Sequence, residues 1–196
     1  MLIMIRVACI GDSITWGFSL MDPWRQSYPA LLQEKLGEGY DVRNFGCNGA
    51  SVRFDADLPY GRTMAFRTSL DWKPDIVLMM LGSNDATPFH WDSTVFIRDY
   101  KRIIAEYRDL PSAPRIILIA PVRIHRVMGM TFMDLSPETL EQCIRPAIRE
   151  IAADTGVEVM DLVELFPDAR YCLDGVHPQE TGAKMIAERI YEGVGW

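Results

Sequence analysis

Three side chains near the two ends of this sequence have the chemistry of a serine acyl-transfer site. Ser13 lies in the sequence Gly-Asp-Ser-Ile-Thr-Trp-Gly, directly after an apolar run, and Asp174 and His177 lie in the sequence Asp-Gly-Val-His-Pro. A serine hydroxyl becomes a good nucleophile when a base removes its proton, and a carboxylate can orient that base. The serine, the histidine and the aspartate supply these three roles from opposite ends of one chain.

Ser13 is the candidate nucleophile. A serine that follows a buried strand and begins a short helix presents its hydroxyl at the edge of the sheet, with its own N–H pointing the same way. The same position also fits an ordinary helix N-cap or a phosphate site at a helix N-terminus. The phosphate interpretation is disfavoured because the sequence contains neither a P-loop nor a G-x-G-x-x-G motif.

His177 is the candidate base. Pro178 disfavours helical dihedral angles at the residue before it and fits the first position of a helix, so His177 should lie on a rigid turn. Asp174 is three residues earlier, where its carboxylate could select the imidazole tautomer and stabilise the imidazolium. The alternative is a helix cap with an exposed histidine. A metal site is disfavoured because the three histidines, at positions 90, 125 and 177, show no ligand spacing.

Two further positions could donate hydrogen bonds to an oxyanion. Asn84 follows the most apolar predicted strand, where its amide could donate to developing negative charge, although ordinary turn chemistry also explains the sequence Gly-Ser-Asn-Asp. Gly49 follows the second predicted strand, and a glycine lets the backbone N–H approach a ligand closely. Gly46 competes with Gly49 for this role.

The elements that must position these residues are short apolar runs alternating with longer helical patterns. The pattern predicts strands at residues 3–10, 41–45, 75–81, 115–120 and 157–161 and helices at residues 27–36, 94–107, 137–153 and 179–191. Pro146 should kink the third helix or begin a new segment. Strands buried on both faces and joined by crossover helices predict a doubly wound parallel sheet with helices on both sides. The carboxyl ends of its strands, and the loop at residues 121–135, should form one ligand-binding rim.

Length and composition fit one soluble globular domain, residues 1–196. The net charge of −7 disfavours a nucleic-acid partner, because a phosphate backbone would be repelled. The apolar start is too short for a membrane span and lacks the features of a signal peptide, so we expect a cytoplasmic protein. The four cysteines have no metal-like spacing and are expected to be buried free thiols.

Four sequence blocks, in this order, resemble those of the SGNH, or GDSL-like, hydrolases. They are Gly-Asp-Ser at residues 11–13, Asn-Phe-Gly-Cys-Asn-Gly at residues 44–49, Gly-Ser-Asn-Asp at residues 82–85 and Asp-Gly-Val-His-Pro at residues 174–178. Each block is weak alone, but together they span nearly the whole chain. The resemblance implies an α/β, three-layer flavodoxin-like fold of about five strands and a metal-independent esterase that needs no cofactor.

The resemblance also implies a role for each matched residue. Ser13 would attack an ester carbonyl, and His177, oriented by Asp174, would take the serine proton and return it to the leaving alcohol. The Ser13 N–H, the Gly49 N–H and the Asn84 side chain would hold the oxyanion. Asp12 is expected to support the turn that carries the serine.

The substrate is expected to be a small-molecule or carbohydrate ester. The Trp-Gly pair after the serine most resembles members of the family that remove O-acetyl groups from carbohydrates. Trp16, Trp24, Phe54, Trp91 and His125 could form an aromatic rim that faces a sugar, although packing of most of them against the core or the loops is the favoured explanation. Of these, Trp16, Trp91 and His125 are the candidate substrate-binding residues. Met128 lies in an apolar loop that could line the acyl pocket, cover the core or contact another subunit.

Three classes of function follow from the sequence. The first is a carbohydrate O-acetylesterase, and the second is a broader acylesterase, thioesterase or lysophospholipase-type hydrolase acting on small lipid or aryl esters. The third, a non-catalytic carbohydrate-binding module, is disfavoured because every reacting position is filled. The absence of a long apolar lid or membrane-binding helix also disfavours a lipase. No sequence feature indicates an oligomeric state.

Overall fold

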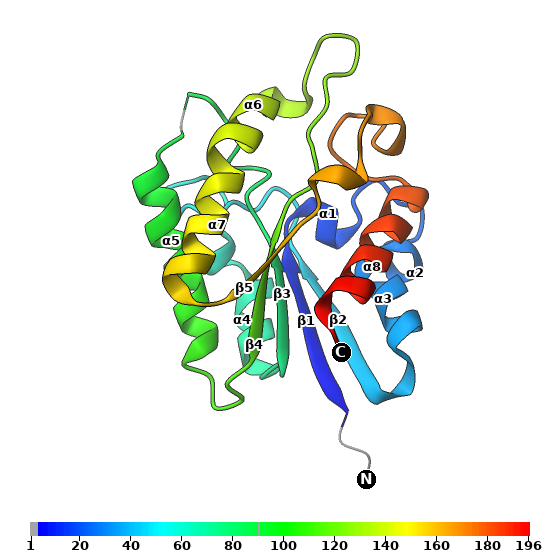
Figure 1. Cartoon of the computed structure of the whole chain (residues 1–196), viewed down its shortest axis with the longest axis vertical. Coiled ribbons are helices and arrows are strands. Elements are labelled where there is room, and N and C mark those ends of the chain that lie inside the picture. The colour runs from blue at the N-terminus through cyan, green and yellow to red at the C-terminus, as the bar shows by residue number, and fades with distance from the viewer. Residues whose placement is uncertain (1–3, 90) are drawn as a thin grey trace.

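A parallel sheet forms the centre of the computed structural model, which describes residues 4–89 and 91–196. Within these ranges, five strands lie in the order β2-β1-β3-β4-β5 (Figure 1). Their bounds are Ile5–Gly11 for β1, Tyr40–Gly46 for β2, Ile76–Met80 for β3, Arg115–Ala120 for β4 and Glu158–Asp161 for β5. The chain passes from β1 to β2 on one side and later returns to β3 on the other. The carboxyl ends of β1 and β3 therefore border the crevice at which such sheets bind ligands.

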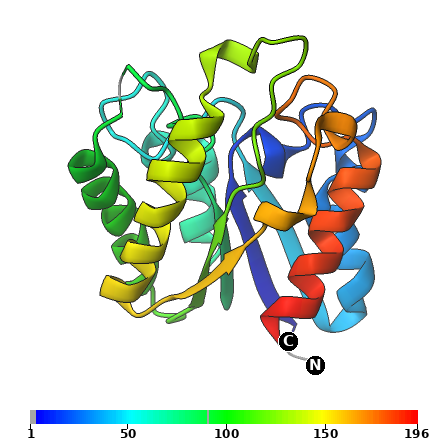
Figure 2. The ribbon, with the colours of Figure 1, turned by 45° about the horizontal axis from the view of Figure 1, so that its top comes forward.

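Helices cover both faces of the sheet, as Figures 1 and 2 show. One face carries α3 (Tyr28–Leu36) and α8 (Glu180–Val194), and the other carries α4 (Met64–Asp71), α5 (Ser93–Arg108) and α7 (Arg145–Thr155). Alternate residues of β1 enter two separate cores, with Ala8 and Ile10 in one and Val7 and Cys9 in the other. The predicted three-layer, doubly wound α/β fold is confirmed.

The two outer strands correct one part of the prediction. Strands β1, β3 and β4 are buried along nearly their whole length, but β2 and β5 are largely half-buried or exposed. Val159 of β5, for example, is exposed. Each outer strand has a neighbour on one side only, so the expectation that every strand is buried on both faces was wrong for these two.

Pro146 begins a new helical segment, which was one of the two predicted outcomes. The short helix α6 (Pro137–Thr139) continues into a π-helical turn, Leu140–Ile144, in which the Arg145 N–H donates to the Leu140 carbonyl. Helix α7 then starts at Arg145, with Pro146 in its first turn, where the N–H that proline lacks is not needed. The segment ends two residues beyond the predicted boundary, at Thr155.

All four cysteines are free, but only Cys9 and Cys172 are buried as expected, whereas Cys47 and Cys143 are half-buried.

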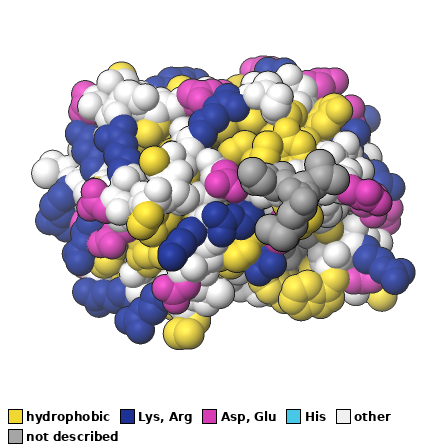
Figure 3. Space-filling view, turned by 90° about the horizontal axis from the view of Figure 1, so that it is seen from below, with side chains coloured by type: hydrophobic (Ala, Val, Ile, Leu, Met, Phe, Trp, Pro, Cys, Tyr) yellow, Lys and Arg dark blue, Asp and Glu magenta, His cyan; other side chains and the backbone are white. Residues whose placement is uncertain are grey.

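Among the described residues, no helix has the length and apolarity needed to cross a bilayer. Basic and acidic side chains are interspersed on the face at the amino ends of the strands (Figure 3). The chemically distinctive side chains lie at the opposite end of the sheet.

Candidate active site

The turn after β1 places Ser13 at the start of the one-turn helix α1 (Ser13–Trp16). Asp12 caps this helix, and its Oδ1 accepts the Ile14 N–H at 2.9 Å. Gly11 has to be glycine because a Cβ there would collide with the side chain of Thr15. Ser13 is only 6% exposed, and its own N–H has no partner within the part of the chain that the structure describes.

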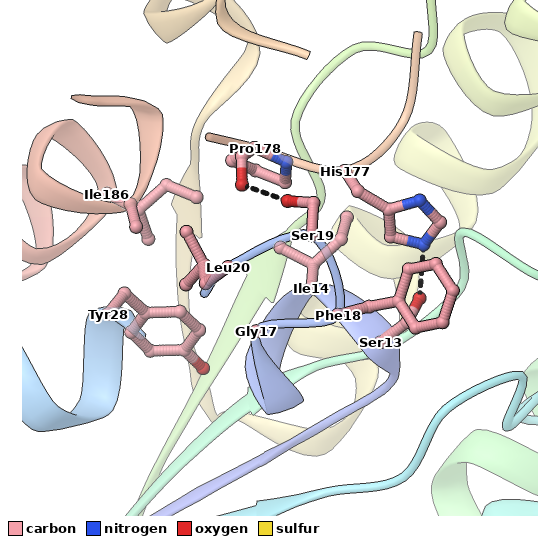
Figure 4. Close-up of a pocket in the computed structure, with 11 residues that line it drawn as sticks. Ser13, Ile14, Gly17, Phe18, Ser19, Leu20, Tyr28, His177, Pro178 and Ile186 are labelled. Carbon is pink, nitrogen blue, oxygen red and sulfur yellow. Dashed lines mark hydrogen bonds between the residues drawn. The ribbon is translucent and has the colours of Figure 1, made fainter. Parts of the chain in front are cut away.

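A continuous chain of hydrogen bonds joins the serine to residues more than 160 positions away. The Ser13 Oγ lies 2.8 Å from His177 Nε2, and His177 Nδ1 lies 2.6 Å from Asp174 Oδ2. Figure 4 shows the imidazole ring directed at the serine hydroxyl. His177 is only 4% exposed. This is the arrangement that a serine nucleophile, a histidine base and an orienting carboxylate would require.

The turn that carries Asp174 and His177 is held by the same carboxylate. Asp174 Oδ1 accepts the N–H groups of Val176 at 2.9 Å and His177 at 2.8 Å. Gly175 has a φ of +85° and no room for a Cβ, because the His125 carbonyl oxygen lies against it. The His125 N–H in turn donates to the Gly175 carbonyl at 2.8 Å. The loop after β4 therefore supports the turn directly.

Asp174 is held in its ionised form. Burial by itself would raise the pKa of this carboxyl, but the hydrogen bonds from the His177 ring, the His177 N–H and the Val176 N–H outweigh it and lower the pKa to about 2. Asp174 therefore carries a negative charge beside the imidazole at any pH near neutrality. This charge favours the tautomer with the proton on Nδ1, which leaves Nε2 free to accept a proton from Ser13.

The loop after β2 distinguishes the two candidate glycines. The Gly46 N–H already donates to Asn44 Oδ1 at 2.9 Å. Gly49 lies in a tight turn closed by the Ala50 N–H and the Cys47 carbonyl at 3.1 Å, and its φ of +76° suits glycine at the third position of such a turn. Among the described residues, no partner is found for the Gly49 N–H. Gly49 thus has the donor that Gly46 lacks.

The loop that carries Gly49 is fastened to the end of β3. Asn84 Nδ2 donates to the Ala50 carbonyl at 3.0 Å, which uses one of its two N–H groups. Asp85 accepts the backbone N–H groups of Val52 at 2.9 Å and Arg53 at 3.2 Å. The loops that carry the predicted donors after β2 and β3 are therefore joined by hydrogen bonds.

Comparison of the sequence with models of known protein families identifies the family of this chain. The family model described as GDSL-like Lipase/Acylhydrolase matches residues 9–185, which include all four sequence blocks. The chain belongs to the GDSL-like lipase/acylhydrolase family. The description of this family names acylhydrolases, which are enzymes that hydrolyse acyl esters.

Known relatives agree with this assignment. An acetylxylan esterase from Xylanibacter ruminicola is 34% identical over 95% of this chain, and the chain spans 42% of that relative's length. A carbohydrate acetylesterase from Sinorhizobium meliloti has the same fold, with a TM-score of 0.79 at 21% identity, covering 97% of this chain and 98% of that chain. A putative arylesterase from Agrobacterium tumefaciens has a TM-score of 0.79 at 22% identity, with the same coverage.

Two aromatic side chains that the sequence analysis did not select lie against the base of this GDSL-like chain. The ring centroids of Phe18 and Phe132 lie 4.8 and 5.0 Å from that of His177. The loop that carries Phe18 is tied to the other end of the chain, because Ser19 Oγ donates to the Pro178 carbonyl at 2.6 Å (Figure 4). Phe18, five residues after the serine, could have been found from the tight turn at residue 17, but no local signal pointed to Phe132.

The four residues expected to bind substrate are placed differently from one another. Trp16 is 37% and Met128 93% exposed, so both are accessible to a ligand. Trp91 packs against Phe96 with a centroid distance of 5.1 Å, and the ring of His125 lies 3.1 Å from the Phe166 carbonyl oxygen. Trp91 and His125 are thus half-buried, and each has a contact within the protein.

No group of three or more potential metal-binding side chains is present in the described ranges, residues 4–89 and 91–196. His90, one of the three histidines considered for metal spacing, lies outside the described residues.

Two buried carboxyl groups lie close to the catalytic residues of the predicted triad. Burial raises the pKa of Asp12 from its ordinary value of 3.8 to about 6, although the Ile14 N–H opposes this change. Burial likewise raises the pKa of Asp85 to about 6 against the N–H groups of Val52 and Arg53. Asp12 Oδ2 has no hydrogen-bond partner among the described residues. The charged form of Asp12 is therefore costly to bury.

Replacing Asp12 with asparagine should make the free energy of unfolding less dependent on pH. Because the pKa of Asp12 is raised in the folded state, its neutral form contributes stability below about pH 4, and this contribution is lost as the pH rises through about 6. D12N should therefore stabilise the fold at pH 7 by up to about 3 kcal/mol, since the change from 3.8 to about 6 is about two pKa units and each unit corresponds to about 1.4 kcal/mol. Urea unfolding at pH 4 and pH 7 measures the difference. D57N, at an exposed position, is the control, and an unchanged pH dependence in D12N would contradict the expectation.

Proposed function

We propose that the chain is a serine O-acetylesterase that removes acetyl groups from carbohydrates. The observation that carries the proposal is the hydrogen-bond chain from Asp174 through His177 to Ser13, with distances of 2.6 and 2.8 Å. The acetyl and carbohydrate parts of the proposal are supported by the 34% identity to an acetylxylan esterase over 95% of the chain.

The reaction follows from the direction of these hydrogen bonds. His177 Nε2 accepts the Ser13 proton while Oγ bonds to the ester carbon, and Asp174 stabilises the imidazolium. The tetrahedral intermediate then collapses, the bond to the sugar oxygen breaks, and His177 returns the proton to that oxygen. A water molecule repeats the sequence on the acetyl-enzyme, which releases acetate and restores the Ser13 hydroxyl.

Three donors that follow β1, β2 and β3 would hold the oxyanion of both intermediates. They are the N–H groups of Ser13 and Gly49, which have no partner among the described residues, and the second N–H of Asn84 Nδ2. Such fixed donors lower the barrier because they are already oriented before charge develops on the carbonyl oxygen. The bond that Asn84 donates to the Ala50 carbonyl and the bonds that Asp85 accepts from the Val52 and Arg53 N–H groups fasten the loop after β2 to the end of β3.

The space beside Ser13 supports a short acyl group. The cavity bordered by Ser13, Phe18 and His177 has a volume of about 10 Å³, enough for roughly one water molecule (Figure 4). Phe18 and Phe132 both pack against the ring of His177. A small space beside the serine favours an acetyl methyl group over a long acyl chain.

The acyl and alcohol preferences of the purified chain test this proposal. We expect acetate release from acetylated xylan, and a kcat/KM for 4-nitrophenyl acetate that exceeds those for the butyrate and the octanoate. A higher kcat/KM for the octanoate than for the acetate would contradict the proposed acetylesterase function. Turnover of aryl acetates without release of acetate from acetylated xylan or acetylated monosaccharides would instead favour the broader acylesterase.

Replacing Asn84 with alanine should lower kcat by about 100- to 1000-fold, with a smaller change in KM, because one oxyanion donor is lost. The measurement is steady-state hydrolysis of 4-nitrophenyl acetate. N48A is a matched control, since Asn48 is exposed in the turn beside Gly49 and should keep parental activity. If N84A lost less than threefold in kcat while keeping its fold, the amide of Asn84 would have no part in stabilising the oxyanion.

A further inference from the structure

A groove begins one helical turn from Ser13 on the side of β2. Trp16, three residues after Ser13 in α1, lines a hollow of about 110 Å³ together with Pro23, Trp24, Asn44 and Gly46. This hollow shares Pro23, Trp24 and Asn44 with a larger one of about 490 Å³ that runs between α3 and β2. The two hollows form a continuous path, here called the Trp24 groove, from the rim of the sheet down its outer edge.

The Trp24 groove presents an indole that serves no packing role. Trp24 is 84% exposed, and none of the residues of α2 (Pro23–Gln26) is buried in the described structure. Tryptophan is rarely left so open to water, because its large apolar face gains most from being covered. A second indole, that of Trp16, is partly exposed at the end of the groove nearest to the serine. The groove therefore offers two flat apolar faces to a ligand.

A peptide that adds a strand to β2 is a poor occupant of this groove. Gln33 of α3 already bonds to the outer edge of that strand, where its Oε1 accepts the Val42 N–H at 2.6 Å and its Nε2 donates to the Tyr40 carbonyl at 3.0 Å. Strand addition requires such edge groups to be free. The groove must bind its ligand through side chains.

The charges along the groove are balanced, which disfavours an anionic ligand. Arg25 and Glu34 are both exposed along it, and Arg43 is paired with Asp41 at 2.9 Å. Flat apolar faces next to scattered hydrogen-bonding groups suit a neutral sugar ring, which has an apolar C–H face and a polar edge of hydroxyl groups.

We propose that the Trp24 groove binds the neutral backbone of a polysaccharide substrate, at sugar units beyond the one whose ester is cleaved. The inference rests on the proposed carbohydrate acetylesterase function, and it adds a second contact that distinguishes polymeric from small substrates. Trp16 connects the candidate active site with the Trp24 groove, because it lies in the same one-turn helix as Ser13 and lines the end of the groove nearest to the serine. A polymer seated on Trp24 would be held close to the serine, which raises the local concentration of its acetyl groups.

A binding assay that needs no catalysis tests the groove. Deacetylated xylan is cast into a native gel, and the migration of the intact chain is compared with that of W24A, W24F and M64A. Xylan should retard the parent, W24F and M64A, because Met64 is exposed outside the groove, and W24A should migrate without retardation. Equal retardation of W24A and the parent, or no retardation of the parent, would overturn the proposal.

Kinetics on two substrates separate this proposal from the proposed function. W24A should lose about tenfold in kcat/KM on acetylated xylan, in line with the loss of one aromatic contact, and should keep parental kcat/KM on 4-nitrophenyl acetate. An equal loss on both substrates, or none on either, would contradict the proposed role of the Trp24 groove. If the parent binds xylan through Trp24 but releases no acetate, the binding role of the groove is supported and the acetylesterase function is rejected. If the parent releases acetate without binding xylan, the acetylesterase function is supported and the binding role of the groove is rejected.

Discussion

Replacing Ser13 with alanine should reduce kcat for ester hydrolysis by about 10⁴-fold or more, because residues that act as one catalytic unit lose nearly all activity when the nucleophile is removed. The Ser13 hydroxyl makes one hydrogen bond of 2.8 Å, to His177 Nε2, so the change removes the reacting atom and little else. The fold should persist, since the two core clusters do not depend on this side chain. Stopped assays with 4-nitrophenyl acetate over long incubation measure the residual rate.

S93A is a suitable control for S13A. Ser93 is exposed at the start of α5 and should retain parental turnover, and both variants should keep the parental circular dichroism spectrum. Full activity in a correctly folded S13A protein would reject Ser13 as the nucleophile. It would also revive the alternative in which Ser13 only begins a helix.

Replacing Asp174 with asparagine should lower kcat by about 10³- to 10⁴-fold. Asp174 Oδ2 accepts the proton of His177 Nδ1 at 2.6 Å, and an amide nitrogen in that place would stabilise the tautomer in which Nε2 can no longer accept the serine proton. The carboxylate also holds the turn through the N–H groups of Val176 and His177. The loss should therefore appear in kcat for all esters, whatever their alcohol.

The pH profile distinguishes this role of Asp174 from a structural one. Because the pKa of Asp174 is lowered to about 2, the carboxylate stays ionised above about pH 4. D174N removes this charge and should therefore change the shape of the pH profile of kcat/KM, whereas a loosened turn would lower the rate at every pH without changing the shape of the profile. D168N is the control, since Asp168 also accepts a backbone N–H two residues later, that of Arg170 at 3.0 Å, but has no hydrogen bond to a histidine among the described residues. Similar effects of D174N and D168N would contradict the assignment.

Much of the fold could be predicted because its strands are strongly patterned. The apolar run that forms β4 was placed with the observed bounds, residues 115–120, and Pro146 marked the start of a helical segment. Helix α4 was not predicted. Only Phe66 and Ser69 of its eight residues are buried, so its apolar stripe is too sparse to stand out from the long loop that precedes it.

The site was predictable where spacing along the chain matters and unpredictable where distant loops meet. Asp174 and His177 share one turn, so their pairing could be expected from sequence and the structure has it at 2.6 Å. The contact of Phe132 with His177 depends on how the loop after β4 folds over the rim. The His125 N–H supports Gly175 through a backbone hydrogen bond between two loops. Such a bond does not depend on the type of side chain, so it could not be predicted from the sequence.

The central claim, that Ser13 is activated by His177 to form an acyl-enzyme, can be tested by covalent labelling. Diethyl 4-nitrophenyl phosphate should react once per chain, forming a bond between phosphorus and the serine oxygen as 4-nitrophenolate leaves. Peptide mass spectrometry should place this label on Ser13, the extent of labelling should match the loss of esterase activity, and H177A should label far more slowly. A chain that loses activity with the label on another residue, or that keeps full activity with Ser13 labelled, would contradict the account.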